Sequence, residues 1–133
     1  EFMHKVSTAY TNYFNRKYKR TGALFSGRFK AEHVTNDRYL NYLFAYIHLN
    51  PIKMIQGDWQ NGKINDIDKA KKHLECYAFS SYLDYQRTQG RLYGLVLSKE
   101  AFPDYFSEPK EFSDFINDWL ELKAKGLEEE GGS

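Results

Sequence analysis

Helical periodicity is the feature that most limits what this chain can fold into. Apolar residues recur at steps of three and four over residues 2–18, 37–50 and 109–125, which is the spacing of one face of an α-helix. Residues 66–77 and 79–86 are predicted to form two shorter helices. A chain of 133 residues is long enough for about one domain. The sequence therefore predicts a small, mainly helical protein.

Two segments are expected to be extended instead. Residues 28–35 alternate loosely between apolar and polar side chains, which is typical of a strand. Residues 92–97 form an apolar run that is expected to pack in extended form. Because an unpaired strand edge promotes aggregation, we expect the first segment to pair with the second or with another chain. Together with the helices, these segments predict a mainly helical α+β fold.

The central helix has clear start and stop signals. Asn36 is a favourable N-cap residue, and Asp37 places a negative charge in the first turn, where it suits the helix dipole. Pro51 disfavours the α-helical region for the residue before it, so the helix is expected to end at about residue 49.

Charge is distributed unevenly along a chain whose net charge is only +1. Residues 1–38 hold eight Lys and Arg residues against three acidic ones, and residues 107–133 hold eight acidic residues against three lysines. Ordinary solvated helix faces explain such a pattern, and so does a basic binding surface near the N-terminus. Tyr and Phe residues are interleaved with the basic ones, which suits the phosphates and unstacked bases of single-stranded nucleic acid, although core packing explains the aromatics equally well.

The rest of the composition excludes several classes of protein. A single cysteine, Cys76, rules out a disulfide within the chain and fits a reducing compartment. No apolar run approaches the length of a membrane span. His73 lies three residues before Cys76, but without a second pair nearby we interpret this spacing as coincidence rather than as a metal site.

A helical wheel of residues 37–50 separates two stripes of side chains. One stripe is apolar and is predicted to face the core: Leu40, Leu43, Phe44 and Ile47. The neighbouring stripe carries three phenols and one amide: Tyr39, Tyr42, Tyr46 and Asn50. Tyr46 and Asn50 are one turn apart, so their side chains are expected to address the same point in space.

This pair has two interpretations. In the structural one, Tyr46 is a half-buried helix residue with its hydroxyl in water, and Asn50 is an ordinary helix stop before proline. In the chemical one, the phenolate of Tyr46 attacks a phosphodiester, and the carbonyl oxygen of Asn50 binds Mg²⁺ or Mn²⁺. The metal would polarise the phosphate and so assist a weak nucleophile. His48 points to a different side of the helix and is interpreted as structural.

Three blocks of the sequence together resemble the REP-associated tyrosine transposases, which are single-tyrosine members of the HUH transposase superfamily. The blocks read TAYTNYFNRKYKRTGALFSGRFKAEHV over residues 8–34, YLNYLFAYIHLNP over residues 39–51 and FSSYLDY over residues 79–85. Their order and spacing match the family from residue 1 to about residue 120.

The resemblance implies a reaction and a partner. The family nicks single-stranded DNA next to imperfect hairpins and leaves a 5′-phosphotyrosine and a free 3′-OH. Tyr46 matches the family's nucleophile, and Asn50 matches the metal ligand that follows it by four residues. The implied cofactor of the complete enzyme is Mg²⁺ or Mn²⁺, and the implied compartment is the bacterial cytoplasm. The basic residues expected to contact DNA are Arg16, Lys17, Lys19, Arg20, Arg28 and Lys30.

The resemblance also implies that the chain carries only part of a catalytic domain. The family's metal-binding histidines form a His-hydrophobic-His pair upstream of the first helix here, and no histidine of this chain matches that pair. Residues 1–55 are expected to be the catalytic-tyrosine half of a ferredoxin-like HUH domain. Residues 56–125 are expected to be a helical extension, and residues 126–133 a disordered tail. Such a chain would pair with the N-terminal part or associate with itself.

A non-catalytic alternative stays open. In this second hypothesis the chain is a free-standing helical module that binds DNA or protein and keeps the tyrosine without using it. Whether the chain is an enzyme depends on the metal ligands that it lacks.

Overall fold

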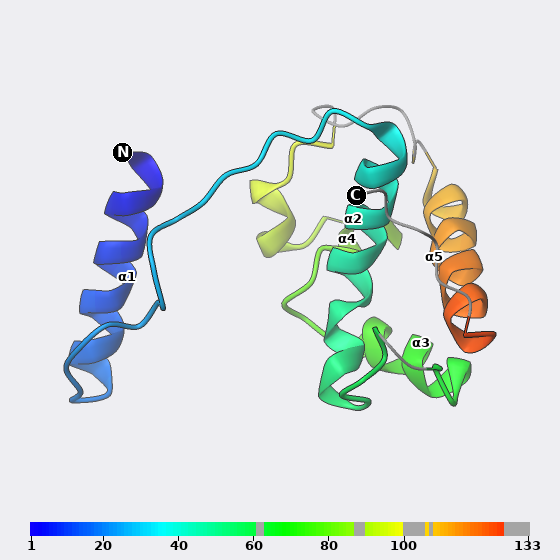
Figure 1. Cartoon of the computed structure of the whole chain (residues 1–133), viewed down its shortest axis with the longest axis horizontal. Helices are drawn as coiled ribbons and strands as arrows, with labels where there is room; N and C mark the ends of the chain where they lie inside the picture. Colours follow the sequence, from blue (N-terminus) through cyan, green and yellow to red (C-terminus); the bar gives the residue numbers. More distant parts are fainter. Residues whose placement is uncertain (61–62, 87–89, 100–105, 107, 127–133) are drawn as a thin grey trace. The chain divides into compact units, whose positions relative to one another are not determined.

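The computed structural model describes residues 1–60, 63–86, 90–99, 106 and 108–126, and it is mainly helical (Figure 1). Within these residues there is no β-strand, so the expected helical character is confirmed. The helices of the described residues are, in chain order, α1 (Phe2–Lys17), α2 (Asp37–Leu49), the 3-10 helix η1 (Asn50–Met54), α3 (Ile67–Cys76), α4 (Tyr82–Gln86), the 3-10 helix η2 (Leu92–Val96) and α5 (Pro109–Ala124).

The chain divides into two compact units. The N-terminal unit is Glu1–Val34, and the main unit is Thr35–Ser133. This division falls about twenty residues before the boundary predicted after residue 55. Within the main unit α2 and η1 pack on each other, η1 packs on α3, and α2 packs on α5. The predicted disordered tail, residues 126–133, lies outside the described residues except for Gly126.

The N-terminal unit is built around α1, which is confirmed and ends one residue before its predicted end at residue 18. None of the residues of this helix is buried. The chain after the helix folds back on it, because the Asn15 side chain donates a hydrogen bond of 3.0 Å to the carbonyl of Gly22. Gly22 has a φ of 95°, a backbone conformation that other residues rarely adopt. This turn brings the ring of Phe25 to 6.4 Å from that of Tyr10.

The two predicted extended segments are absent. Residues 28–35 contain no strand or helix, and the predicted strand there is wrong. An isolated strand is not stable, because its backbone groups need a partner strand, and the described residues provide none. The second segment forms η2 over Leu92–Val96 instead of an extended run. A Cβ atom on Gly94 would lie 2.7 Å from Oδ1 of Asp84, so η2 turns closely around that carboxylate.

The start of α2 is as predicted, but its end differs in detail. The Asn36 side chain accepts a hydrogen bond of 2.8 Å from the backbone N–H of Arg38, which confirms the N-cap. Asn50 keeps a helical conformation, with φ −54° and ψ −33°, although it precedes Pro51. The expectation that Pro51 pushes it out of the α region is therefore wrong. The chain tightens into η1, in which proline is tolerated because the first N–H groups of a helix have no partner inside it.

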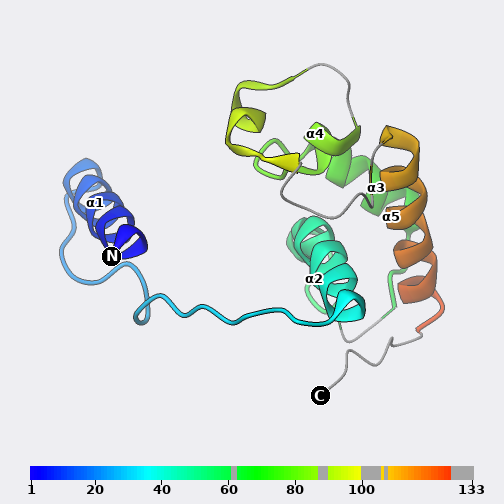
Figure 2. The same ribbon diagram turned by 90° about the horizontal axis from the view of Figure 1, so that it is seen from above.

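The core of the main unit lies between α2, α4 and α5. Figures 1 and 2 show α2 and α5 side by side. The ring of Phe112 on α5 is fully buried, and the aromatic side chains that contact it among the described residues are Phe44, His48, Tyr82, Tyr85 and Phe106. The predicted apolar stripe of α2 is only partly right. Phe44 is buried, but Ile47 is 54% exposed, and Ala45, His48 and Leu49 are buried in its place.

The last helix forms as predicted over Pro109–Ala124. Glu108 and Glu111 form a capping box, in which the side chain of each residue accepts a hydrogen bond from the backbone N–H of the other. Proline in the first turn is also favourable there. These local signals fix where α5 begins, and its buried side chains then place it against α2 and α4.

Phe112→Ala should destabilise the main unit by about 3–5 kcal/mol, because it leaves a cavity in the middle of the aromatic cluster. The measurement is urea unfolding followed by circular dichroism. Phe79→Ala is the matched control, since Phe79 is 81% exposed and its removal should change stability by less than about 0.5 kcal/mol. Equal destabilisation of both variants would contradict the described core.

Candidate functional site

Tyr46 projects from α2 into an aromatic row. Its ring centroid lies 6.2 Å from that of Tyr42, at 29°, and 6.2 Å from that of Trp59, at 32°. The side chain is half-buried, and its hydroxyl makes no hydrogen bond to the described residues. Tyr46 is therefore held by ring contacts on two sides, while its oxygen has no fixed partner in this part of the chain.

A small hollow lies beside the Tyr46 ring. Its volume is about 20 Å³, and it is lined by residues of α2, the following loop and α5: Tyr42, Tyr46, Leu49, Trp59, Gln60, Trp119 and Lys123. Trp59 is 2% exposed, and its Nε1 atom is buried without a hydrogen-bond partner among the described residues. A hollow of this size has room for one water molecule, whose site needs only about 10–15 Å³.

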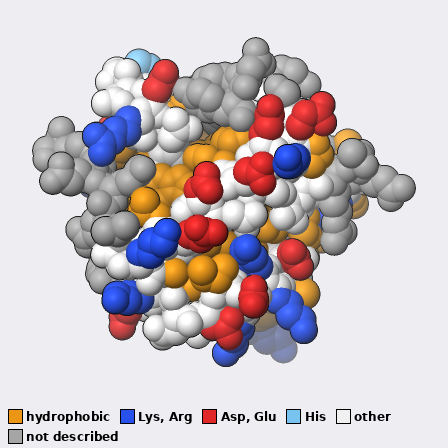
Figure 3. Space-filling model, turned by 90° about the vertical axis from the view of Figure 1, so that its right-hand side faces the viewer, with side chains coloured by type: hydrophobic (Ala, Val, Ile, Leu, Met, Phe, Trp, Pro, Cys, Tyr) orange, Lys and Arg blue, Asp and Glu red, His pale blue; other side chains and the backbone are white. Residues whose placement is uncertain are grey.

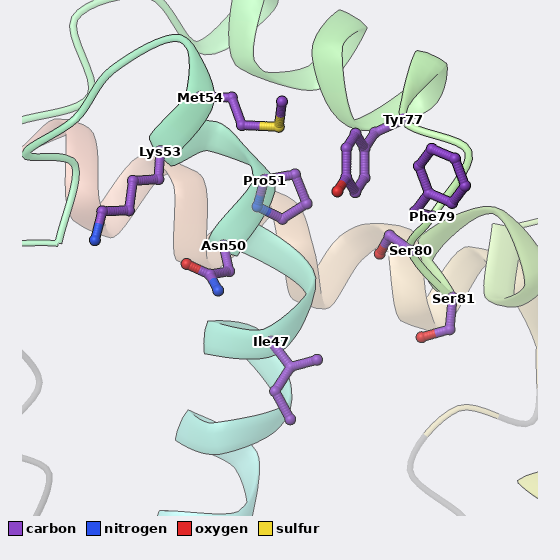
Figure 4. A pocket seen from close by; sticks show the side chains of 9 residues that line it. All are labelled: Ile47, Asn50, Pro51, Lys53, Met54, Tyr77, Phe79, Ser80 and Ser81. Atoms are coloured by element: carbon purple, nitrogen blue, oxygen red, sulfur yellow. The ribbon is translucent and has the colours of Figure 1, made fainter. Parts of the chain in front are cut away.

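Asn50 faces a different pocket. This pocket has a volume of about 520 Å³, and it lies between the end of α2 with η1 on one side and the segment between α3 and α4 on the other (Figure 4). Its lining residues are Ile47, Asn50, Pro51, Lys53, Met54, Tyr77, Phe79, Ser80 and Ser81. Tyr46 is not among them, so the structure does not bring the two predicted site residues into one pocket. Only a backbone bond joins them directly, from the N–H of Asn50 to the carbonyl of Tyr46.

Few side chains near Tyr46 and Asn50 could bind the metal that the resemblance implies. In the part of the chain that the structure describes, no group of three or more His, Cys, Asp or Glu side chains is placed to hold a metal ion. The other polar groups that line the Asn50 pocket are hydroxyls and the ammonium of Lys53. Mg²⁺ and Mn²⁺ prefer carboxylate oxygens, so the described residues by themselves do not fit such a site.

His48 connects α2 to the start of α4. It is 3% exposed, and its Nδ1 lies 2.8 Å from the carbonyl of Phe44, which can only accept, so Nδ1 carries the proton. Nε2 then accepts a hydrogen bond of 2.8 Å from the hydroxyl of Ser81. Burial lowers the pKa of His48 from its ordinary value of 6.5. This burial agrees with the structural role expected of His48, but its bond to Ser81 spans 33 residues and could not be predicted from spacing.

A buried charge pair holds the segment between α3 and α4. Asp84 accepts a hydrogen bond of 2.9 Å from Nε of Arg91, and this bond is the main reason that the pKa of Asp84 is lowered. The same guanidinium donates to the carbonyls of Ala78, at 3.0 Å, and Ser80, at 2.7 Å. Lys99 donates to the backbone carbonyl of Asp84 at 2.7 Å. No sequence signal points to this arrangement, because nothing in a lone Asp or Arg predicts a partner seven residues away in a loop.

The predicted DNA-contacting residues belong to the N-terminal unit and are all exposed: Arg16, Lys17, Lys19, Arg20, Arg28 and Lys30. Lys17 lies 5.6 Å from the ring centre of Tyr13, and Arg20 lies 5.7 Å from that of Phe14. None of the six forms an ion pair with an acidic side chain among the described residues. Their charges are therefore available to an anionic partner.

The main unit has no comparable basic region on the face shown in Figure 3. Acidic and basic side chains are interspersed there with hydrophobic ones. This face lies on the side that carries α5, whose residues include both lysines and acids. In the sequence, residues 1–34 hold seven Lys and Arg residues against two acidic ones, whereas residues 35–133 hold twelve against sixteen, so the excess of positive charge belongs to the N-terminal unit.

Comparisons with known proteins add no assignment. No protein-family model matches the sequence, and neither the curated proteins nor the solved structures that were compared give a match. Among the described residues, no helix has the length and apolar character needed to cross a membrane.

Acidification should lower the free energy of unfolding through His48. Because the folded-state pKa of His48 lies below 6.5, the unfolded chain takes up the proton first as pH falls. Above a pH of about 6.5, His48 is neutral in both states and does not make stability depend on pH. Below that pH, the free energy of unfolding decreases through His48 by at most about 1.4 kcal/mol per pH unit. Urea unfolding at about pH 7.5 and about pH 5.5 measures the change.

His48→Gln is the control for this effect, since it keeps a polar side chain that does not titrate. The stability of the variant should fall less than that of the wild type between the two pH values, because the two proteins differ only at residue 48. An equal decrease in both would show that His48 does not cause the pH dependence.

Proposed function

We propose that this chain is the tyrosine-bearing, DNA-binding part of a transposase that cleaves and rejoins single-stranded DNA through a 5′-phosphotyrosine intermediate. The observation that carries the proposal is the phenol of Tyr46, which is held between two rings and has a hydroxyl without a hydrogen bond to the described residues. A half-buried phenol whose oxygen is not tied to another described protein group is available to attack a phosphodiester, as the chemical interpretation of this helix requires. We further infer that the chain is the C-terminal part of a ferredoxin-like HUH domain with a helical extension.

The proposed chemistry needs only one atom of Tyr46. The phenol oxygen loses its proton and forms a bond to phosphorus, the bond from phosphorus to the 3′ oxygen breaks, and that oxygen takes up a proton. The product is a 5′-phosphotyrosine and a free 3′-OH, and the reverse reaction rejoins a strand. Mg²⁺ or Mn²⁺ would assist in the complete enzyme, but all of its ligands other than Asn50 would come from outside the described residues.

The N-terminal unit supplies the DNA-binding part of the proposal. Its six exposed basic side chains have no acidic partner among the described residues, and rings of Tyr13 and Phe14 lie beside two of them. Basic side chains bind phosphates, and aromatic faces accept unstacked bases, which together suit single-stranded DNA. The bacterial cytoplasm is the proposed compartment, and association with an N-terminal part or with a second copy is the proposed assembly.

A second candidate function is a helical module that binds DNA or protein without catalysis. One observation favours it: Tyr46 and Asn50 line different pockets, although a shared metal site would bring them together. The two candidates differ in whether a covalent protein–DNA adduct forms, which the following prediction tests.

Tyr46→Phe should abolish covalent attachment to DNA in a protein that carries the family's histidine strand ahead of this chain. The change removes the nucleophilic oxygen but keeps the ring between Tyr42 and Trp59, so DNA binding should be nearly intact. The measurement is the protein–DNA adduct on a denaturing gel, after incubation with a single-stranded hairpin substrate and Mg²⁺ or Mn²⁺. Asn50→Ala should slow adduct formation without abolishing it, since the nucleophile remains.

Tyr42→Phe and Tyr39→Phe are matched controls on the same helix and should have mild effects. If Tyr46→Phe still forms the adduct and either control does not, the assignment within α2 is wrong. If no tyrosine of the helix matters, the catalytic proposal fails and the module without catalysis is favoured.

Replacing Arg16, Lys17, Lys19 and Arg20 together by alanine should weaken binding of single-stranded DNA and make it less sensitive to salt. The slope of log K against log salt should become shallower by about 0.7 for each phosphate that the variant no longer neutralises. Fluorescence anisotropy at several salt concentrations measures this slope. An unchanged slope would place the DNA elsewhere on the chain.

A further inference from the structure

Phe79 is a large apolar side chain that the fold exposes. It lies in the segment between α3 and α4, and it is 81% exposed. Two pockets share it as a wall together with Ser80 and Ser81. The first is the pocket of about 520 Å³ that Asn50 lines, and the second has a volume of about 330 Å³. Phe79 therefore lies between two neighbouring pockets of the main unit and lines both of them.

The backbone on both sides of Phe79 is fixed. Arg91 donates hydrogen bonds to the carbonyls of Ala78 and Ser80, the residues directly before and after it. The guanidinium is itself held by the buried carboxylate of Asp84. A free loop would let an exposed ring turn inward, whereas this clamp keeps Phe79 turned toward solvent. A ring whose backbone is already fixed loses little conformational freedom when a ligand covers it, which favours binding there.

The first pocket combines the groups that recognise a nucleotide. The rings of Tyr77 and Phe79 meet edge to face, with centroids 6.0 Å apart, on one side of the pocket. Asn50 and Lys53 also line this pocket, and Figure 4 shows them across Pro51 from the two rings, with their side chains extending away from the rings. The amide of Asn50 both donates and accepts hydrogen bonds, as a base edge requires, and Lys53 has no ion pair among the described residues.

The second pocket is mainly apolar. Leu92, Tyr93 and Val96 of η2 line it, and the ring centroid of Tyr93 lies 6.3 Å from that of Phe79. Arg91 and Asp84 also line this pocket, and they are already paired with each other. This side therefore offers ring and aliphatic surface to a flat, uncharged group, and the first side offers polar contacts and one positive charge.

We propose that Phe79 is a wedge that separates two consecutive bases of single-stranded DNA. One base stacks on Phe79 in the first pocket with its phosphate at Lys53, and the next base lies against Tyr93 in the second pocket. Base stacking on aromatic side chains is a common mode of single-strand binding, and it needs no particular sequence. The inference rests on the proposed function, because it takes single-stranded DNA as the ligand.

The test compares the wild type with Phe79→Ala for binding to two fluorescent oligonucleotides of equal length and charge. One is oligo-dT, and the other is an abasic chain with the same phosphates. Phe79→Ala should weaken oligo-dT binding by a factor between about 5 and about 150, the effect of removing one aromatic ring from a stacked base. Binding to the abasic chain should be weaker than to oligo-dT and should not change in the variant.

Two further variants keep the test specific. Leu95→Ala removes an apolar side chain that is 79% exposed but lines neither pocket, so it should leave binding unchanged. Phe79→Trp keeps an aromatic face and should retain oligo-dT binding. Circular dichroism should be the same for all variants, since none of the replaced side chains is buried.

The outcomes separate this inference from the proposed function. Suppose that Phe79→Ala binds oligo-dT as the wild type does, while the variant with Arg16, Lys17, Lys19 and Arg20 replaced by alanine does not bind it. The proposed role of Phe79 is then wrong, and the proposed function stands. If the wild type binds neither oligonucleotide, both are wrong. If the wild type instead binds an apolar peptide at Phe79 and no DNA, the pockets belong to a protein partner, which also overturns the inference.

Discussion

The aromatic packing around Phe112 is the interaction on which the rest of the main unit depends. Phe112 of α5 contacts Phe44 and His48 of α2 and Tyr82 and Tyr85 of α4, so one ring joins three helices. Each aromatic pair adds about 0.5–1.5 kcal/mol to the burial itself, and the pairs share a single rigid arrangement. Because α2 is fixed in this way, its two remaining faces are fixed too. One carries Tyr46, and the other carries Ile47 and Asn50.

The hydrogen bonds beside this cluster fix the segment between α3 and α4 rather than the core. His48 bonds to Ser81, and Arg91 bonds to the carbonyls around Phe79, so the segment from Ala78 to Ser81 is tied at several points. A buried ion pair such as Asp84 with Arg91 is weak evidence for stability, since desolvation offsets most of its attraction. Its effect here is geometric: it fixes one backbone conformation and with it the direction of an exposed ring.

Local signals in the sequence are sufficient to predict the helices but not their surroundings. The periodicity of α1, α2 and α5 and the N-cap at Asn36 depend on neighbours within one turn, and all are predicted correctly. Ile47 is exposed although its stripe is apolar, because such a stripe does not distinguish a core from the wall of a pocket. The segments at 28–35 and 92–97 have the composition of extended chain, but composition does not supply a partner strand. The bonds of His48 and Arg91 to distant backbone and hydroxyl groups are tertiary and have no local pattern.

The separation of Tyr46 from Asn50 bears directly on the proposed chemistry. Helical spacing puts the two residues one turn apart, and the side chains diverge because Tyr46 stacks between Tyr42 and Trp59 while Asn50 lines the larger pocket. Leaving two ring contacts costs Tyr46 on the order of 1–3 kcal/mol. One charge-assisted contact to a phosphate offsets much of that cost. In the proposed reaction the phenol of Tyr46 would have to turn out of this row to meet a phosphate at Asn50, and two ring contacts but no hydrogen bond among the described residues oppose that rotation.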